Sequence, residues 1–173
     1  MLEPMAVRVE VWPVAADDLG IWLISGDDAW RTGTVPADNE PHAELEALLH
    51  DRGALDSAAV LHSTSWRVDG PHVFLTYMAV IRTDDLVRAT WPAALPIVAE
   101  LPDAVGKPPT HAPTEPPAPR YIDVLMHGLR HLRFLLDNDA TNAAALPDIW
   151  RRHLAPLEPA LATMYDEHHK IVN

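Results

Sequence analysis

The strongest alternation of apolar and polar residues lies between residues 58 and 82, where two β-rich runs flank a Val-Asp-Gly-Pro turn at residues 68–71. Asp-Gly between apolar runs is typical of a β-hairpin because both residues tolerate positive φ angles. The second run, Val73 to Ile81, is apolar on both faces and predicts a central, covered strand. In the first run, alternation predicts that five residues share one face of the sheet. These are Val60, His62, Thr64, Trp66 and Val68.

Shorter strands are expected before this hairpin. Apolar and polar residues alternate over residues 7–12, which predicts a first strand, and we expect Pro13 to end it. Residues 20–25 predict a second strand, and residues 29–32 predict a short third one.

One helix is expected between these strands and the hairpin. Asp38, Asn39 or Glu40 can cap it, Pro41 should lie in its first turn, where proline is favoured, and it should run to about Arg52. Gly53 is the natural residue to follow its C-terminus. Three leucines should form its buried face. They are Leu45, Leu48 and Leu49.

The last third of the chain changes from strand-like to helical patterning. Seven prolines between residues 102 and 119 exclude a helix or a central strand there and indicate an extended linker or a surface loop. Beyond them, apolar residues at 3-4 spacing from Ile122 to Leu136 predict one helix, and residues 148–169 predict a second helical region. Two such neighbours are typical of an antiparallel αα-hairpin.

Together the elements predict an α+β fold. We expect a mixed, mostly antiparallel sheet with one internal helix, a Pro-rich crossover and a C-terminal helical hairpin. The expected segments are a sheet domain at residues 1–101, a linker at residues 102–119 and the αα-hairpin at residues 120–173.

Composition narrows the partners and the compartment. The 173 residues contain 13 Lys and Arg against 25 Asp and Glu, a formal charge of −12, which disfavours binding to a nucleic-acid duplex. The chain has no cysteine, so disulfides and thiolate chemistry are excluded. No apolar run approaches the roughly 18 residues of a membrane span, and the N-terminal residues lack a signal-peptide pattern. We therefore expect a soluble, cytoplasmic protein without membrane partners.

The order of two strands, a loop, a capped helix ending in Gly and a long hairpin resembles a Nudix domain, over about residues 6–100. The resemblance implies a loop-helix-loop motif whose glutamates bind Mg²⁺ beside a pyrophosphate. With the motif aligned on its final Gly, Asp38 falls on its early Glu and Asp51 on one of its two metal-binding Glu. Ala47 and His50 stand where the family has further glutamates. The resemblance is thus to a degenerate, non-hydrolysing member or to a divergent Mg²⁺-dependent hydrolase of a nucleoside diphosphate derivative.

The hydrolase alternative assigns definite roles to the helix carboxylates. Glu46 and Asp51 would be catalytic, and Asp38, Glu44 and Asp51 would hold Mg²⁺, with Glu46 as a further candidate ligand. The competing interpretation is that the helix leucines pack on the sheet while these carboxylates face water. No cofactor is then expected.

A second candidate metal site lies in the C-terminal third. Asp123, His127 and His131 follow one another at four-residue spacing and so lie on one stripe of a helix. Two His four residues apart can chelate one transition-metal ion. The alternative is a polar stripe at the edge of the helix pair.

Aromatic and strand residues supply the candidate ligand contacts. Trp30, Trp66 and His62 are expected near the loop or on the surface of the sheet, where a tryptophan can stack a planar, nucleotide-like ligand or anchor a partner. Since no complete catalytic set emerges, the main hypothesis is a non-enzymatic interaction or ligand-binding module that self-associates. The apolar seam from Ile122 to Leu136 favours a homo-oligomer or a protein partner.

Overall fold

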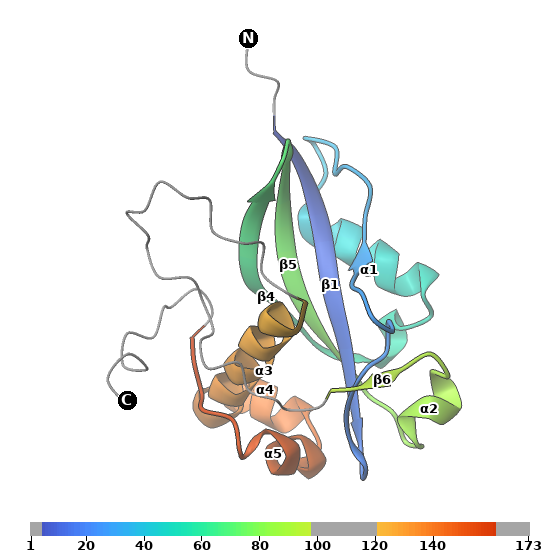
Figure 1. The fold of residues 1–173 in the computed structure, drawn as a ribbon, viewed down its shortest axis with the longest axis vertical. Coiled ribbons are helices and arrows are strands. Elements are labelled where there is room, and N and C mark those ends of the chain that lie inside the picture. Colours follow the sequence, from blue (N-terminus) through green and yellow to red (C-terminus); the bar gives the residue numbers. More distant parts are fainter. Residues whose placement is uncertain (1–4, 98–120, 162–173) are drawn as a thin grey trace. The chain divides into compact units, whose positions relative to one another are not determined.

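The computed structural model describes residues 5–97 and 121–161 (Figure 1). The chain divides into two compact units, residues 1–97 and residues 98–173, each considered below by itself. The Pro-rich segment at 102–119 and the end of the second predicted helical region, residues 162–169, lie outside the described residues. No helix of the described part is long and apolar enough to cross a membrane.

The first unit is built on one mixed sheet. Among the described residues it has six strands, in the order β4-β5-β1-β2-β6, with β3 also paired to β1. Only β1 and β5 run parallel, and the other pairs are antiparallel, which confirms the predicted α+β class. The strands are β1 (Ala6–Asp17), β2 (Gly20–Leu23), β3 (Trp30–Arg31), β4 (Ala58–Asp69), β5 (His72–Ile81) and β6 (Leu95–Pro96). The sequence did not predict β6.

Strand β1 continues through Pro13, so the prediction that this proline ends the strand was wrong. On one side β1 pairs with β5 without interruption. On its other side, pairing with β3 ends at Val11 and pairing with β2 begins at Val14. Pro13 lies between these two partners, where its carbonyl accepts a hydrogen bond from the amide of Ile24 at 3.0 Å. A missing N–H is tolerated at such a change of neighbour.

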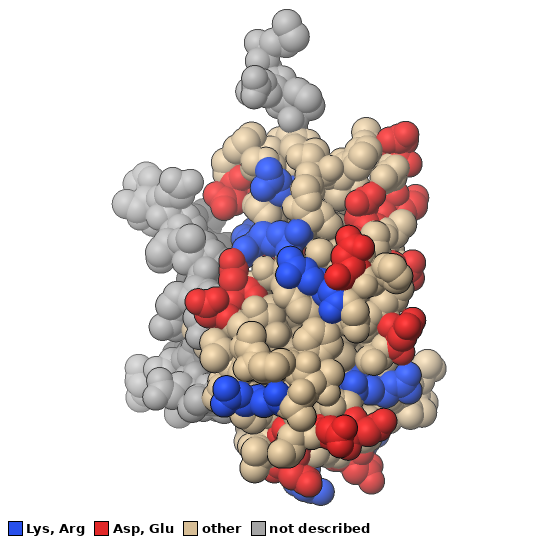
Figure 2. Space-filling view, turned by 90° about the vertical axis from the view of Figure 1, so that its right-hand side faces the viewer, with Lys and Arg blue, Asp and Glu red and all other residues tan. Residues whose placement is uncertain are grey.

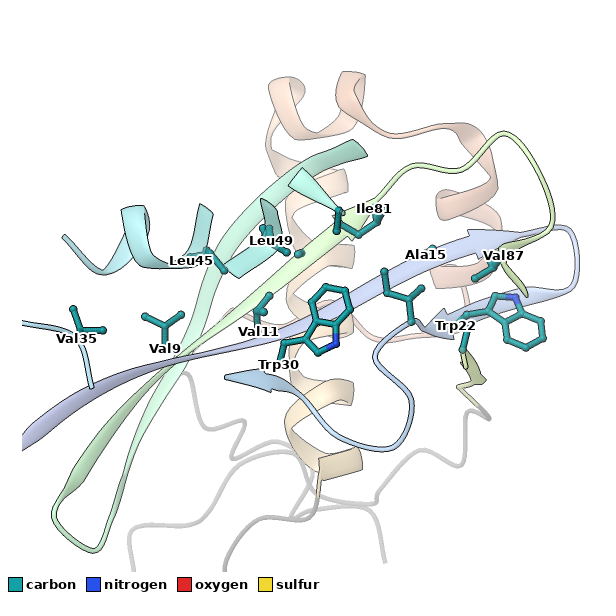
Figure 3. Packing of buried hydrophobic residues seen from close by; sticks show 14 residues of the cluster. Val9, Val11, Ala15, Trp22, Trp30, Val35, Leu45, Leu49, Ile81 and Val87 are labelled. Carbon is teal, nitrogen blue, oxygen red and sulfur yellow. The ribbon is translucent and has the colours of Figure 1, made fainter. Parts of the chain in front are cut away.

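Helix α1 (Pro41–Asp51) covers one face of the sheet, as predicted. It begins with proline, and Gly53 follows it with a φ of 68°, the left-handed conformation that ends many helices. Leu45 and Leu49 are fully buried and face Val9, Val11 and Ile81 in the core (Figure 3). Leu48 is only partly buried.

The β4–β5 hairpin forms as predicted, but one face assignment was wrong. The ladder is regular from Leu61 to Ser63 and then shifts, so that Thr64 is an extra residue on β4. A β-bulge of this kind reverses the alternation. As a result Trp66, opposite Leu75, lies on the α1 face, whereas His62, opposite Met78, lies on the other face.

Asp17 joins three parts of the first unit at the end of β1. Its carboxylate accepts hydrogen bonds from the Leu19 amide (2.9 Å), the Trp22 indole (2.8 Å) and the Val87 amide (2.8 Å). Val87 begins the short helix α2 (Val87–Thr90). This buried carboxylate therefore fixes the β1–β2 turn to α2.

The second unit is helical. Helix α3 (Tyr121–Asn138) matches the predicted leucine seam, and Leu125, Leu129, Leu132 and Leu136 are all buried. A short helix that was not expected, α4 (Ala140–Ala145), follows, with Asp139 capping its first amides. Helix α5 (Asp148–Leu154) buries Trp150 and Leu154 and packs with α3.

Candidate functional site

The end of the sheet nearest the β4–β5 turn carries different chemistry on its two faces. The α1 face is apolar there, because Trp66 and Val68 of β4 lie opposite Leu75 and Val73 of β5. The labelled core side chains lie further along the same face (Figure 3). The opposite face carries a buried glutamate and several arginines.

Glu10 is the central residue of the charged face. It lies in the middle of β1, and its side chain is 0% exposed. Its two carboxylate oxygens accept hydrogen bonds from the two Nη atoms of Arg67 on β4, at 2.5 and 2.7 Å. Arg31 on β3 donates from Nε at 2.9 Å. Weaker contacts at 3.3 Å come from the Trp12 indole and the Thr76 hydroxyl. The carboxylate is thus paired and saturated.

Sheet register explains this convergence. Glu10 lies directly opposite Thr76 on β5 and Arg31 on β3. Asp28 then accepts two hydrogen bonds from the outer nitrogens of Arg31, at 2.6 and 2.7 Å. Opposite residues on neighbouring strands share a face and stand close together. Three strands and one turn therefore supply a chain of alternating charges.

The neighbouring arginines decide the ionisation of the Glu10 and Asp28 carboxylates. Burial by itself raises the pKa of Glu10, but the hydrogen bonds and positive charges of Arg67 and Arg31 outweigh that effect and hold the pKa below its ordinary value of 4.5. Hydrogen bonds from Arg31 likewise lower the pKa of Asp28, against a smaller opposing effect of burial. Both carboxylates are therefore ionised at neutral pH.

The apolar face forms an uncovered patch, which we call the hairpin surface. It comprises Trp66 and Val68 of β4 and their opposite residues Leu75 and Val73 of β5. Trp66 is 65% exposed and Val68 54% exposed, and the two β5 residues are half-buried. Strand β4 is an edge strand of the sheet (Figure 1). Contiguous exposed apolar side chains of this kind are typical of interaction sites.

The carboxylates predicted to hold Mg²⁺ lie on or next to α1 and point outward. Glu44 accepts a hydrogen bond from Asn39 at 2.6 Å. Glu46 lies 3.5 Å from His42, and Asp51 lies 3.8 Å from His50. Asp38 is exposed in the loop before the helix. The structure therefore places these side chains beside local partners, and their metal-binding and catalytic roles stay predictions.

The predicted ligand contacts are separated in the structure. Trp30 is 8% exposed and belongs to the core, with the Trp91 ring at 6.1 Å and the Arg52 guanidinium 5.5 Å from its ring centre. His62 is half-buried on the opposite face of the sheet. Of the three, only Trp66 presents a large aromatic surface to solvent.

The histidine stripe of α3 is also divided by burial. His131 is 5% exposed and stacks on Phe134, with ring centres 6.1 Å apart. Asp123 and His127 are half-buried. Across residues 5–97 and 121–161, no three His, Asp or Glu side chains gather closely enough to hold a metal ion. The chelate of His127 and His131 stays a prediction.

Basic and acidic side chains alternate on the face of the molecule drawn in Figure 2. Lys and Arg form several separated groups there, with Asp and Glu beside them. No continuous basic band is visible on that face.

Comparisons with protein-family models, with curated proteins and with the solved structures found no match to this chain. The function must therefore be argued from the residues themselves.

Sequence reasoning missed the Glu10 network. Alternation placed Glu10 on the polar side of its strand, together with Arg8 and Trp12. The available signal was charge: Glu10, Arg31 and Arg67 are residues of opposite sign that fall within three predicted strands. Strand order, which the sequence did not provide, was needed to place them together.

Proposed function

We propose that the protein is a non-enzymatic binding module that self-associates through the hairpin surface. The observation that carries this proposal is the exposure of Trp66 and Val68, side by side on one face of an edge strand. Leaving a tryptophan in water forgoes burial of most of its apolar area, which is large. A surface that keeps such a residue exposed favours a partner that covers it.

A second copy of the chain fits this surface in charge and shape. The four residues of the hairpin surface are uncharged, whereas the chain as a whole carries −12. Two copies would repel each other across most other surfaces but less so here. Two sheet faces can pack on each other at about 10 Å, as they do in sandwich arrangements. Two-fold symmetric pairs are also the commonest assemblies of identical chains.

The bulge at Thr64 favours face packing over extension of the sheet through its edge. A bulge bends and twists an edge strand, which interrupts the row of hydrogen-bonding groups that another strand would need. Strand β4 has a further register shift between Ala58 and Val60. The α1 face of the strand, rather than its outer edge, is therefore the proposed contact.

The scaffold is proposed to be a degenerate Nudix-like one. Support comes from α1, which follows β3, precedes the hairpin and ends in Gly53, as the resemblance implies. The α1 carboxylates contact helix neighbours or Asn39, which favours binding over Mg²⁺-dependent hydrolysis.

Analytical ultracentrifugation of the full chain tests this proposal. We expect a concentration-dependent dimer whose dissociation constant rises at least about tenfold in Trp66→Ser, because a central tryptophan commonly contributes 2 kcal/mol or more to an interface. The matched control is Leu19→Ser, which removes an exposed leucine from the β1–β2 turn. It should leave the constant unchanged. A wild-type chain that stays monomeric, or a dimer equally stable in Trp66→Ser, would contradict the proposal.

A further inference from the structure

Two arginines flank one phenylalanine on the charged face of the sheet. In the register of the sheet, Phe74 on β5 is opposite Arg67 on β4 and also opposite Arg8 on β1. The three side chains therefore form a row across adjacent strands on one face. The Arg67 guanidinium lies over the Phe74 ring, 4.6 Å from its centre. The row places two cations on either side of an aromatic ring.

The two guanidinium groups are in different states. Both Nη atoms of Arg67 donate to Glu10, which fixes the group in place, yet its side chain is still 27% exposed. Arg8 is half-buried, and its Nε is buried without a hydrogen-bond partner among the described residues. A buried donor without an acceptor is costly, and an arginine has five such N–H groups. Arg8 thus provides donors that an added acceptor would satisfy.

The charges of this face also leave room for an anion. Arg8, Arg31 and Arg67 contribute three positive charges, while Glu10 and Asp28 contribute two negative ones. Asp69, further along β4, is exposed and makes no ion pair with either arginine of the row. Of the three arginines, Arg8 is therefore the one without a paired carboxylate among the described residues, although the chain as a whole is acidic.

We propose that Arg8 and Arg67 bind the phosphate or carboxylate group of a small molecule beside Phe74, whose ring is buried and already covered by the Arg67 guanidinium. Arginine suits such groups because its planar donors match their oxygens in pairs. Glu10 acts as a positioning residue, since it holds Arg67 by two of its N–H groups and leaves the others available. The site lies on the sheet face opposite the hairpin surface, so its occupancy and the proposed self-association are separate properties.

NMR titration of the ¹⁵N-labelled full chain with inorganic phosphate, and separately with succinate, tests this site. We expect saturable shifts at the amides of Arg8, Phe74 and Arg67 with at least one of the two anions. The anion that saturates identifies the chemical source of the group. Arg8→Gln should weaken binding at least about tenfold, the effect expected for loss of a charge-assisted hydrogen bond. Arg8→Lys should restore part of it.

The matched control is Arg88→Gln, which removes the same charge from an exposed arginine of α2. It should bind as the wild type does. Shifts that do not saturate with either anion, or a titration that is identical in Arg8→Gln, would overturn the proposal. Because Arg8 makes no hydrogen bond to Glu10, its replacement should leave the fold intact. An unchanged amide spectrum away from the row would check that.

Discussion

At the scale of single residues, Glu10 shows how a carboxylate can be fully buried and still ionised. Removing it from water is costly, but two guanidinium groups and two further donors, the Trp12 indole and the Thr76 hydroxyl, compensate that cost. An ion pair of this kind is worth less than its attraction suggests, yet it is expensive to break because a charge is then left buried. Glu10 is therefore expected to be among the residues of the first unit that tolerate substitution least.

Glu10→Gln should lower the free energy of unfolding at pH 7 by about 3–5 kcal/mol, the cost of removing one partner of a buried pair. The low pKa of Glu10 in the folded chain sets the pH dependence. Its stabilisation is complete above the ordinary value of 4.5 and is lost as the pH falls through the lower folded pKa. Urea denaturation from pH 7 to pH 3 should show the difference between wild type and variant shrinking on acidification.

Asp69→Asn is the control for that series, because Asp69 is an exposed carboxylate with no ion pair on the same face of the sheet. It should change stability by less than about 0.5 kcal/mol. A difference between wild type and Glu10→Gln that stayed constant down to pH 3 would show that the charge of Glu10 does not stabilise the fold.

At the scale of elements, local signals predicted most of the chain and tertiary pairing explains the exceptions. The Asp-Gly turn, the proline at the start of α1 and the glycine after it are chemical signals contained in a few residues, and each produced the expected structure. The prediction that Pro13 ends β1 was wrong because a strand tolerates proline where its neighbour changes, and the neighbours of β1 are set by tertiary pairing. The face predicted for Trp66 was wrong because alternation alone does not reveal the inserted residue at Thr64. It moved Trp66 to the other face.

For the candidate sites too, single residues could be recognised from the sequence, but their spatial neighbours depended on strand pairing. Trp66 could be singled out from the sequence as a possible anchor, but the face on which it lies follows from the bulge at Thr64. Glu10, Arg8 and Arg67 could not be grouped, because β1 meets β5 and, through it, β4 only in the folded sheet.

Gly53 provides a test of the helix end. Its φ of 68° is strained for any other residue, and its position offers open space for a side chain. Gly53→Ala should therefore destabilise the chain by about 1 kcal/mol through backbone strain alone. Gly33→Ala is the control, since Gly33 also has open space but no positive φ. Denaturant midpoints that move equally in both variants would contradict this explanation.

At the scale of the whole molecule, the two proposed surfaces and the Mg²⁺ alternative predict different responses to ligands. A thermal-shift panel of nucleoside diphosphate derivatives, with and without Mg²⁺, separates them because a ligand of the native state raises the melting temperature. The arginine row predicts shifts that do not need Mg²⁺ and that diminish in Arg8→Gln. A ligand-specific shift that required Mg²⁺ and disappeared in Asp51→Asn would favour the hydrolase instead.

The parallel pairing of β1 with β5 has a consequence for synthesis. Val7, Val9 and Val11 leave the ribosome before β5, the strand that pairs with all three, which begins at His72 and comes after β2, β3, α1 and β4. At about 5–20 residues per second, β1 waits several seconds for its neighbour. During that interval its apolar residues are available to chaperones and to other nascent chains. Codon changes that slow translation between α1 and β5 should therefore lower the soluble yield more than the same changes placed after β5.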